Sequence, residues 1–529
     1  MITISSNKAL SASSYSAWRE YRKLKYSAQK IQPNTYCFLY SIIIEVNASS
    51  ELLAIEKTMT SITSQTYKNI EIIIINLSNL SINNELIQAS MSLRGIREIK
   101  EVDKSDFFDT NKLDRLARGD FLFMASPGTS WDPGAFMLIN HTINLRKNTP
   151  DLIACDYDIE TASNQYDDPV FFTEWDPLVY SENIESAAIG ISHTFINKYC
   201  RVKFNSIKDW FEESIKDKAD INVANIYENI VHLPCNKDNI NKMHELNLDD
   251  LKGILISIII PNKDNLHLLK KCLQFLESDR IWNLELIIVD NNSTDKETWD
   301  YYDQLEKKFN AKINIMPHKF NFSKMINSGV AVAKGSALVF LNNDVEFTQP
   351  NQIEELILEA LRPEVGVVGS LLLNEDFSIN HAGVMLTQDG MAGHVLRGAK
   401  TSDKYVIRYI KQKRNYQALT GALMATRKDV FEKVGGMDEV NLPIEYNDTD
   451  FCLKLRMLNL QVVCLPLKGI IHKESSTRKY TENYYAMMQH EKAKRTMLNR
   501  WPDCFRHEPF ANPHLNILET SSINLNYDD

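Results

Sequence analysis

Acidic and amide side chains follow three short hydrophobic runs in the second half of the chain. These polar segments are Pro261-Asn262-Lys263-Asp264, Asp290-Asn291-Asn292-Ser293-Thr294-Asp295 and Asn342-Asn343-Asp344. Each one alone is also typical of a turn or of the N-terminus of a helix. Their recurrence after three successive runs favours a shared site in which carboxylates and amides bind a polar ligand or perform catalysis.

The hydrophobic runs that precede these segments predict buried strands. Ser257-Ile258-Ile259-Ile260 and Leu286-Ile287-Ile288-Val289 are short and rich in β-branched residues, as is typical of strands in a parallel sheet. A helical stretch separates them, which gives the strand, helix, strand order of an open α/β sheet. Because ligands bind beyond the carboxyl ends of such strands, we expect the polar segments to converge on one crevice.

The same pattern occurs earlier in the chain, as an internal repeat. Ser41–Glu45 corresponds to Ser257–Pro261, Asn69–Asn76 corresponds to Asn283–Asp290, and Asn111–Leu113 with Ala117–Phe123 corresponds to Asn327–Gly329 with Ala333–Val339. Self-similarity over several elements indicates two copies of one fold. The sequence therefore predicts two tandem α/β domains, each with a mostly parallel, Rossmann-like sheet.

Changes in composition suggest where these domains begin and end. A polar and charged segment at Asn236–Gly253 separates the two copies. We expect an N-terminal helical extension over residues 1–35, with its helix around Ala17–Tyr26, a first domain over 36–240 and a second domain over 254–500. Residues 501–529 show little periodicity and are expected to form an irregular C-terminal tail.

Composition excludes several broad classes of protein. With 529 residues, 44% hydrophobic and 24% charged, the chain is typical of a globular protein of two domains. A formal net charge of -10 argues against nucleic-acid binding through the phosphate backbone. The longest apolar runs, such as Ile254–Pro261, are far shorter than a membrane span of about 20 residues, so any membrane association is expected to be peripheral.

The cysteines and the N-terminus bear on localisation. The cysteines are scattered, with no closely spaced pair: Cys37, Cys155, Cys200, Cys235, Cys272, Cys452, Cys464 and Cys504. This favours a reduced, cytoplasmic compartment. The residues after Met1 lack a basic region followed by an apolar core, so no secretory signal is expected. Cytoplasmic localisation, including the inner face of the membrane, is the prediction.

The ordered motifs of the second half resemble the family 2 glycosyltransferases with the GT-A fold, including O-antigen and rhamnosyltransferase-like members of bacterial polysaccharide synthesis. The resemblance covers nearly all of that half, and it rests on the segments 258–261, 289–295, 321–327, 341–346, 381–384, 420–422, 435–439, 447–456 and 472–475. It implies two tandem GT-A domains and a transferase that takes a sugar from a nucleotide-sugar donor.

The resemblance also implies a divalent cation, Mn²⁺ or Mg²⁺, that binds after the central strand. The motif there is Asn342-Asn343-Asp344, with Asn342 where many relatives have an aspartate. Asp344 is therefore the main expected ligand, Asn342 is a weaker candidate, and His472 stands where many GT-A enzymes have a further metal ligand. These cations prefer oxygen ligands and are commonly held by one or two carboxylates together with substrate phosphates.

A general base is expected as well, because an acceptor hydroxyl must lose its proton as it attacks the sugar. Asp448 matches the base position of the family. Asp450 is the alternative, and the run Asn447–Asp450 would also suit the start of a helix without any catalytic role. The resemblance implies direct displacement with inversion at the anomeric carbon.

The remaining site residues are those expected to bind the nucleotide sugar. By resemblance, Asp290 contacts the ribose or the base, and Pro261, Lys263, Asn327 and Asn343 line the same pocket. The donor nucleotide is expected to be UDP or dTDP. The acceptor is expected to be a glycan or a lipid-linked glycan, with a protein acceptor as the alternative, and the motifs identify neither the donor sugar nor the linkage.

The first copy lacks the residues expected to act in the second. Ser126 stands opposite Asn342, Gly128 opposite Asp344 and Asn76 opposite Asp290. No segment before the linker resembles Asn447–Asp450. We therefore predict a degenerate, non-catalytic GT-A-like domain.

Three other functions fit parts of the sequence. A nucleotidyltransferase would normally carry a glycine-rich loop after its first strand, and Pro261–Asn265 has no glycine. A non-catalytic scaffolding or binding protein would not need to retain Asp344, Asp448 and His472 together. A bifunctional polymerase would need acids that the first copy lacks.

Overall fold

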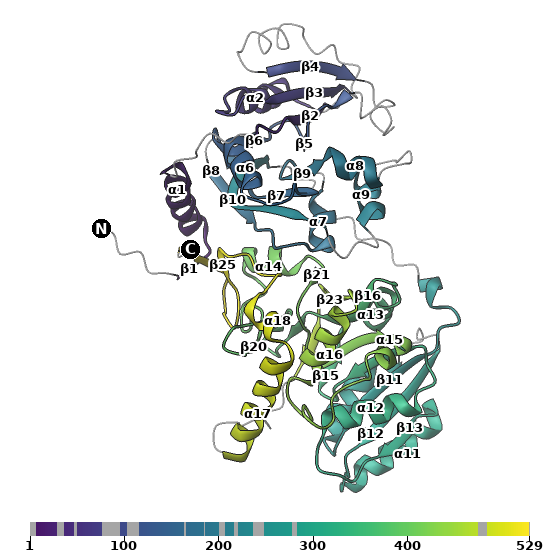
Figure 1. Ribbon diagram of the computed structural model, residues 1–529. Coiled ribbons are helices and arrows are strands. Elements are labelled where there is room, and N and C mark those ends of the chain that lie inside the picture. Colours follow the sequence, from purple (N-terminus) through teal and green to yellow (C-terminus); the bar gives the residue numbers. More distant parts are fainter. Residues whose placement is uncertain are drawn as a thin grey trace. The chain divides into compact units, whose positions relative to one another are not determined.

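The computed structural model describes residues 7–28, 36–46, 50–76, 96–102, 116–162, 165–184, 186–199, 207–215, 221–235, 248–277, 283–473 and 484–527. The chain divides into two compact units (Figure 1). Unit 1 comprises Met1–Asn241, Ala511–Asn516 and Asn524–Asp529, and unit 2 comprises Lys242–Phe510 and Ile517–Ile523. The division between Asn241 and Lys242 falls inside the predicted linker, most of which lies outside the described residues.

Unit 1 is built on a sheet with the order β4-β3-β2-β5-β9-β7-β10-β6, and β8 pairs with β7. The strands are β2 (Tyr40–Val46), β3 (Ile70–Asn76), β4 (Ile96–Val102), β5 (Phe121–Ala125), β6 (Ser130–Trp131), β7 (Leu152–Ala162), β8 (Gln165–Val170), β9 (Ile189–Ser192) and β10 (Val223–Pro234). The helices are α1 (Ala12–Ala28), α2 (Leu52–Thr63), α6 (Ala135–Asn144), α7 (Pro177–Asn183), α8 (His193–Tyr199) and α9 (Ile207–Ile215). The helix predicted around Ala17–Tyr26 is confirmed as α1, whereas the predicted block Asn111–Leu113 lies outside the described residues.

Unit 2 contains a sheet with the order β13-β12-β11-β14-β22-β16-β23-β21. Its strands are β11 (Ile256–Asn262), β12 (Leu284–Asp290), β13 (Lys312–Ile315), β14 (Ala337–Leu341), β16 (Val365–Ser370), β21 (Arg414–Asn415), β22 (Leu423–Arg427) and β23 (Gln461–Leu465). A smaller sheet joins β15 (Val345–Phe347), β24 (Ile470–His472), β17 (Leu372–Leu373) and β18 (Ile379–His381), and β19 (Val384–Leu386) pairs with β20 (Ala392–His394). The helices are α10 (Leu266–Cys272), α11 (Lys296–Phe309), α12 (Phe322–Val332), α13 (Gln352–Ala360), α14 (Lys404–Ile410), α15 (Lys428–Lys433), α16 (Asn447–Arg456), α17 (Tyr484–Arg500) and α18 (Pro502–Arg506).

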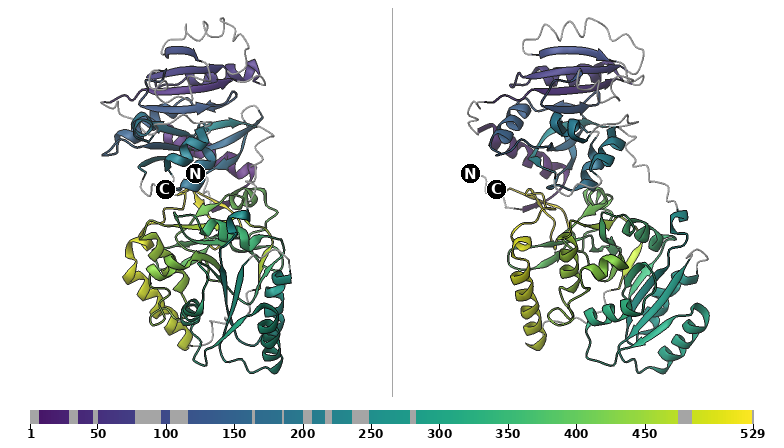
Figure 2. Two further views of the ribbon diagram at one scale, coloured as in Figure 1. Left: turned by 90° about the vertical axis from the view of Figure 1, so that its right-hand side faces the viewer. Right: turned by 45° about the vertical axis from the view of Figure 1, so that its right-hand side comes forward.

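The two sheets have the same topology. Their orders correspond position by position, from β4 and β13 at one edge to β10 and β23. The directions correspond too, because β2 and β11 are parallel to both of their neighbours, whereas β9 and β22 are antiparallel to theirs. Two views from other directions let the reader follow each sheet and its flanking helices (Figure 2). The predicted fold class, tandem α/β domains with mostly parallel sheets, is therefore confirmed.

A side-chain cluster at the start of the strands is repeated in both units. In unit 2, Ser257 Oγ donates to Glu285 Oε2 at 2.6 Å and accepts the Gly335 N–H at 2.9 Å. In unit 1, Ser41 Oγ donates to Glu71 Oε1 at 2.5 Å and accepts the Gly119 N–H at 2.8 Å. A Cβ at either glycine would come within 2.8 Å of the serine's own backbone nitrogen, so only glycine permits this close approach.

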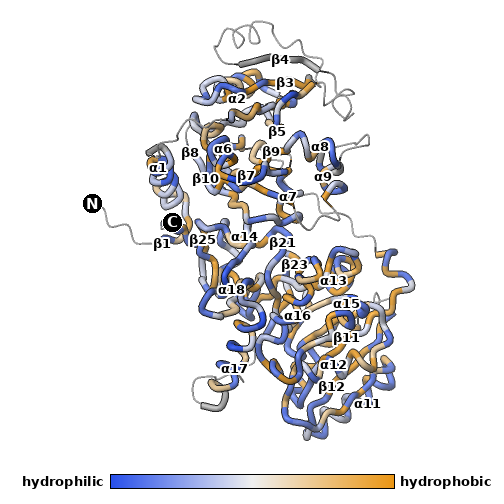
Figure 3. Tube along the Cα trace, in the orientation of Figure 1, coloured by the Kyte–Doolittle hydropathy of each residue, from blue (hydrophilic) through white to orange (hydrophobic). Residues whose placement is uncertain are grey.

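Hydrophobic strands supply the core of each unit. Every residue of β11 is buried, as are nearly all residues of β2. In Figure 3 the strands β11 and β12 are mostly orange, whereas α11 is mostly blue. Burial on both faces explains why these strands read as continuous apolar runs. In the described part of the chain, no helix is both long enough and apolar enough to cross a bilayer.

The C-terminal tail is ordered, which corrects the prediction that it is irregular. Its strands β25 (Leu515–Asn516) and β26 (Asn524–Asn526) pair with each other, and β26 also pairs with β1 (Asn7–Ala9). The fully buried Trp18 of α1 donates from Nε1 to the Asn526 carbonyl at 2.9 Å. Asn512 Nδ2 donates to the buried Asp156 carboxylate at 3.0 Å. The two ends of the chain thus complete unit 1.

We expect unit 1 to be less stable in a chain that ends at Phe510 than in the full chain. Truncation removes β25 and β26 and leaves the buried Asp156 without Asn512, and an unsatisfied buried polar group costs about 1–3 kcal/mol. Limited proteolysis should cut unit 1 of the truncated chain faster than that of the full chain. A chain that ends at Tyr527 is the control and should resist like the full chain. Equal resistance of all three would contradict this role of the tail.

Unit 1 should also lose stability in acid through His514. Its Nε2 donates to the Tyr227 carbonyl at 2.6 Å, and its ring packs edge-on against Trp18. Burial, with Arg22 nearby, lowers the pKa of His514 from 6.5 to about 4. The neutral ring therefore stabilises the fold above pH 6.5, and about 3 kcal/mol is lost as the pH falls from 6.5 to 4. In urea unfolding followed by tryptophan fluorescence, His514→Gln should show a smaller loss than wild type over this range.

Candidate active site

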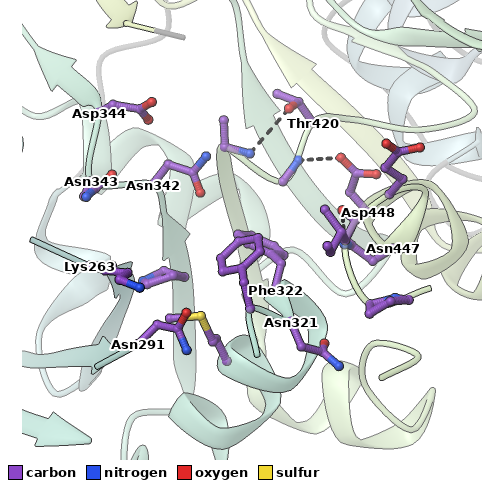
Figure 4. A pocket seen from close by; sticks show the side chains of 18 of the residues that line it. Lys263, Asn291, Asn321, Phe322, Asn342, Asn343, Asp344, Thr420, Asn447 and Asp448 are labelled. Carbon is purple, nitrogen blue, oxygen red and sulfur yellow. Dashed lines mark hydrogen bonds between the residues drawn. The ribbon is translucent and has the colours of Figure 1, made fainter. Parts of the chain in front are cut away.

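The carboxyl ends of β11, β12 and β14 open into one cleft of about 990 Å³ in unit 2 (Figure 4). Asp344 and Asp448 lie on opposite sides of this cleft, the first just after β14 and the second in the first turn of α16. Of the residues that the sequence singled out, those that line it are Pro261, Lys263, Asn342, Asn343, Asp344, Asp448 and His472. The polar segments that are far apart in the sequence thus meet in one place.

Asp290 is not among the residues that line the cleft, and its predicted contact with the nucleotide stays a prediction. Its carboxylate is fully buried and accepts hydrogen bonds from Ser293 N at 2.8 Å, from Ser293 Oγ and from Tyr302 Oη at 2.8 Å. Tyr302 Oη accepts from Asn262 Nδ2 at 2.6 Å, and Asn262 Oδ1 accepts from Asn343 Nδ2 at 2.5 Å. Asp290 is therefore the final acceptor of a chain that fixes the side chain of Asn343 in the cleft.

Asn327 also lies outside the cleft lining, contrary to the prediction. Its Nδ2 donates to the Met437 carbonyl and to Glu439 Oε1, at 2.9 and 2.8 Å, and its Oδ1 accepts the Met437 N–H at 3.0 Å. Glu439 itself lines the cleft. Asn327 therefore acts on the site by holding the loop that carries Glu439.

His472 faces the acidic loop because β15 pairs with β24, in the register that places Val345 beside His472. The His472 Nε2 lies 3.4 Å from Asp344 Oδ1. The His472 Nδ1 lies 3.0 Å from Asn380 Oδ1, an oxygen that can only accept, so Nδ1 carries the proton. In the neutral ring Nε2 is then unprotonated, which is the state of a histidine that binds a metal.

The pair formed by Asp344 and His472 fits a divalent cation. Adjacent ligands of a six-coordinate Mg²⁺ or Mn²⁺ lie about 3 Å apart, close to the observed separation of the two atoms. Within the described ranges, no group of three or more His, Cys, Asp and Glu side chains is arranged to hold a metal ion. A cation at this pair would thus need further ligands from substrate phosphates or water. Asn342 lies in the same loop, and its backbone N–H donates to the Ala422 carbonyl at 2.9 Å.

The two aspartates at the start of α16 have different environments. Asp448 is partly exposed in the cleft, where Oδ2 accepts the Gly421 N–H at 2.9 Å and Oδ1 accepts the Thr449 N–H at 2.7 Å. Asp450 is fully buried and pairs with Arg500 at 2.8 Å, with Lys454 at 3.0 Å and with Trp501 Nε1 at 2.9 Å. Of the two, only Asp448 can reach a molecule in the cleft.

Other cleft residues were not predicted as site residues. They include Asn291, Asn321, Phe322, Asn380, His394, Arg397, Thr420 and Gln489. Asn291 could have been found from its place immediately after a strand, next to Asp290. Asn321, Phe322 and Thr420 fall in segments that carry the family resemblance. His394, Arg397 and Gln489 belong to no strand-end motif, and local sequence gives no signal for them.

In unit 1, the loop that corresponds to the Asp344 loop has no space for an acidic side chain at the equivalent position. Gly128, opposite Asp344, has a φ of +94°, and its N–H donates to the Ala54 carbonyl and to Thr58 Oγ1, both at 2.9 Å. A Cβ at Gly128 would lie 2.9 Å from Pro234 Cβ. The backbone conformation and the packing therefore leave no room for a carboxylate side chain at this position.

About half of the chain is similar in sequence to known proteins. Residues 257–435 match the family model described as Glycosyl transferase family 2. The chain is 32% identical over 266 residues to the uncharacterized protein y4gI of Sinorhizobium fredii, with 49% of this chain and 29% of that protein aligned. It is 33% identical over 271 residues to the O-antigen biosynthesis protein RfbC of Myxococcus xanthus, with 50% of this chain and 20% of that protein aligned. The chain thus spans less than a third of the length of these relatives.

The chain is also similar to a crystal structure of GalNAc-T7 with UDP, GalNAc and Mn²⁺. It has a TM-score of 0.38 and 15% sequence identity, and the alignment covers 48% of this chain and 50% of that one.

Substitutions of the two aspartates should differ in their effect on stability. Asp450→Asn weakens a buried carboxylate's pairs with Arg500 and Lys454, and breaking such pairs costs about 3 kcal/mol or more. Asp448→Asn should change the free energy of unfolding by less than about 1 kcal/mol, because the amide oxygen still accepts from the backbone. Urea unfolding curves of the two variants and wild type test this, and equal destabilisation by both would contradict the assignment.

Proposed function

The second unit is a family 2 glycosyltransferase domain, and from this premise we propose that the chain is a metal-dependent, inverting glycosyltransferase. It moves a sugar from a UDP- or dTDP-linked donor to a hydroxyl group of an acceptor. The observation that carries this proposal is the placement of Asp344 with His472 on one side of a single cleft and of Asp448 on the other. One side suits a diphosphate with its cation, and the other suits proton removal from the attacking hydroxyl.

The cation is proposed to bind between Asp344 and His472, with Asn342 in the same loop. When bound, Mn²⁺ or Mg²⁺ supplies Lewis-acid stabilisation of the charge that develops on the departing nucleoside diphosphate. Lys263, which follows β11, adds a positive charge to the lining of the same cleft. Asn343, held by the chain of hydrogen bonds that ends at Asp290, presents a fixed amide to the donor.

Asn291 supports a preference for uracil or thymine. Its Nδ2 donates to the Met316 carbonyl at 2.9 Å and to the His318 carbonyl at 2.8 Å, so both amide hydrogens are in use. The Oδ1 that remains is an acceptor in a residue that lines the cleft. An acceptor suits the N3–H of uracil and thymine, whereas cytosine has an acceptor at its N3. We therefore favour UDP and dTDP over CDP as the nucleotide.

Asp448 is proposed as the general base. Hydrogen bonds from the backbone of Gly421 and Thr449 hold its carboxylate in one orientation. Its place in the first turn of α16 fixes its position in the cleft. As the acceptor hydroxyl attacks the anomeric carbon, its proton passes to Asp448 and the bond from that carbon to the diphosphate oxygen breaks. Asp450, enclosed by its partners, cannot take this role.

The name of the Myxococcus relative suggests the kind of acceptor. Because RfbC is an O-antigen biosynthesis protein, we propose that the acceptor here is a growing surface glycan or a lipid-linked glycan. A protein acceptor is the alternative. For unit 1 we propose a non-catalytic role, and the loop at Gly128 supports it, because that loop cannot carry a metal-binding carboxylate.

The deciding experiment measures release of nucleoside diphosphate from UDP-, dTDP-, GDP- and CDP-sugars by the full chain, with Mn²⁺, with Mg²⁺ or with EDTA. We expect turnover of UDP- or dTDP-linked donors with a metal and none with EDTA. Asp344→Ala should abolish it, and Asp448→Asn should lower it by about 10²- to 10⁴-fold, the usual contribution of a general base.

Asp429→Ala is a matched control, because the Asp429 side chain is 80% exposed and lies outside the cleft lining. Its activity should equal that of wild type. Turnover that persists in EDTA would refute the metal dependence. Failure of a folded wild-type chain to bind or turn over any donor would instead favour a scaffolding function.

A further inference from the structure

Asn380 joins two histidines of the cleft. It lies in β18, its side chain is 2% exposed, and it uses two different oxygens as acceptors. Its side-chain Oδ1 accepts from His472 Nδ1 at 3.0 Å, and its backbone carbonyl accepts from His394 Nδ1 at 3.1 Å. His472 and His394, which come from different sheets, are therefore oriented by one residue.

The orientation of the Asn380 amide is itself determined by its neighbours. Asn380 Nδ2 donates to Asn374 Oδ1 at 3.0 Å. Ser378 Oγ donates its own proton to Asp376 Oδ1 at 2.6 Å, so it accepts from the nitrogen of the Asn374 amide at 2.9 Å. The oxygen of Asn374 must therefore face Asn380. The oxygen of Asn380 must then face His472, which requires a proton on His472 Nδ1. In the neutral ring, Nε2 then carries no proton and faces Asp344.

The C-terminal segment Ile517–Ile523 holds the other histidine. Glu519 N donates to the His394 carbonyl at 2.9 Å, and Glu519 Oε1 accepts the His394 N–H at 2.5 Å. The next residues continue this pairing, because Leu396 N donates to the Ile517 carbonyl at 2.7 Å. The backbone of His394 is thus fixed at both its donor and its acceptor. Its ring also packs edge-on against the fully buried His381, with 4.9 Å between the centroids.

We propose that Asn380 is a positioning residue for the cation site and that Glu519, in the C-terminal segment, secures it through His394. Asn380 keeps His472 in the tautomer whose Nε2 can bind a divalent cation beside Asp344. Glu519 keeps the His394 backbone in place, so that the His394 ring stays bonded to the Asn380 carbonyl and β18 cannot shift away from β24. This inference rests on the proposed function, because it assigns a support to the cation site of that function.

The test is a titration of the full chain with Mn²⁺ alone, with free Mn²⁺ measured by electron paramagnetic resonance. Asn380→Ala should bind Mn²⁺ about 10- to 100-fold more weakly than wild type, the usual effect of removing a group that orients a metal ligand. Asn380→Asp keeps an oxygen that accepts from His472 Nδ1 and should restore most of the affinity. Glu519→Ala should weaken binding by a smaller factor, whereas Glu519→Gln, which retains an acceptor oxygen, should bind like wild type.

Two further comparisons separate positioning from general loss of structure. Asn314→Ala is the matched control, because Asn314 also donates a side-chain hydrogen bond, to Ser328 Oγ at 2.7 Å, but lies outside the cleft lining. It should leave Mn²⁺ affinity unchanged. Because Glu519 acts through Asn380, the double variant Asn380→Ala with Glu519→Ala should bind no more weakly than Asn380→Ala alone. Glu519 is exposed, so its variants should fold even if Asn380→Ala does not.

The outcomes distinguish this inference from the proposed function. Wild-type affinity for Mn²⁺ in folded Asn380→Ala and in Glu519→Ala overturns the inference alone. The same weakening in Asn314→Ala also overturns it, because the effect would not be specific to the His472 support. A wild-type chain that binds no Mn²⁺ overturns both the inference and the metal dependence in the proposed function.

Discussion

The buried carboxylate of Asp290 is the constraint on which the cleft depends. A carboxylate at this depth is tolerated only if its oxygens are hydrogen-bonded, and the backbone and hydroxyl of Ser293 with Tyr302 meet that need. These hydrogen bonds fold the segment after β12 back toward the strand. Through Tyr302 they also fix the side chains of Asn262 and Asn343. Asn262 and Asn343, which line the cleft, are thus fixed by a residue that does not line it.

The two units share residues that support the fold but differ at the position of Asp344. Both keep the serine, glutamate and glycine cluster at the start of the strands, represented by Ser41 in unit 1 and Ser257 in unit 2. At the other end of the sheet the two units differ, because Gly128 of unit 1 stands at the position of Asp344 in unit 2. Stability comes from packing and bonds along the strands, whereas ligands bind beyond their carboxyl ends. Residues at the carboxyl ends can therefore differ between two copies that share one fold.

The sequence predicted the strands well because burial on both faces leaves unbroken apolar runs, such as that of β11. It also predicted which strand ends meet. It did not predict that the Asp290 side chain is buried against Ser293 and Tyr302, because the position of a residue in a strand does not identify its hydrogen-bond partners. The pairing of β26 with β1 joins Asn524 to Ala9, and no local pattern can reveal partners so far apart in the chain. The role of Asn380 was missed for the same reason, since its histidine partners lie on other strands.

The contrast between Asp448 and Asp450 follows from helix geometry. Two residues along an α-helix are rotated by about 200°, so side chains at these positions point in nearly opposite directions. Asp450 is fixed to Arg500 and Trp501, at the junction of α17 and α18, and this anchors one face of the first turn of α16. The opposite face must then turn toward Gly421 and the cleft. The buried Asp450 thus determines where Asp448 points, and the proposed role of Asp448 depends on both aspartates.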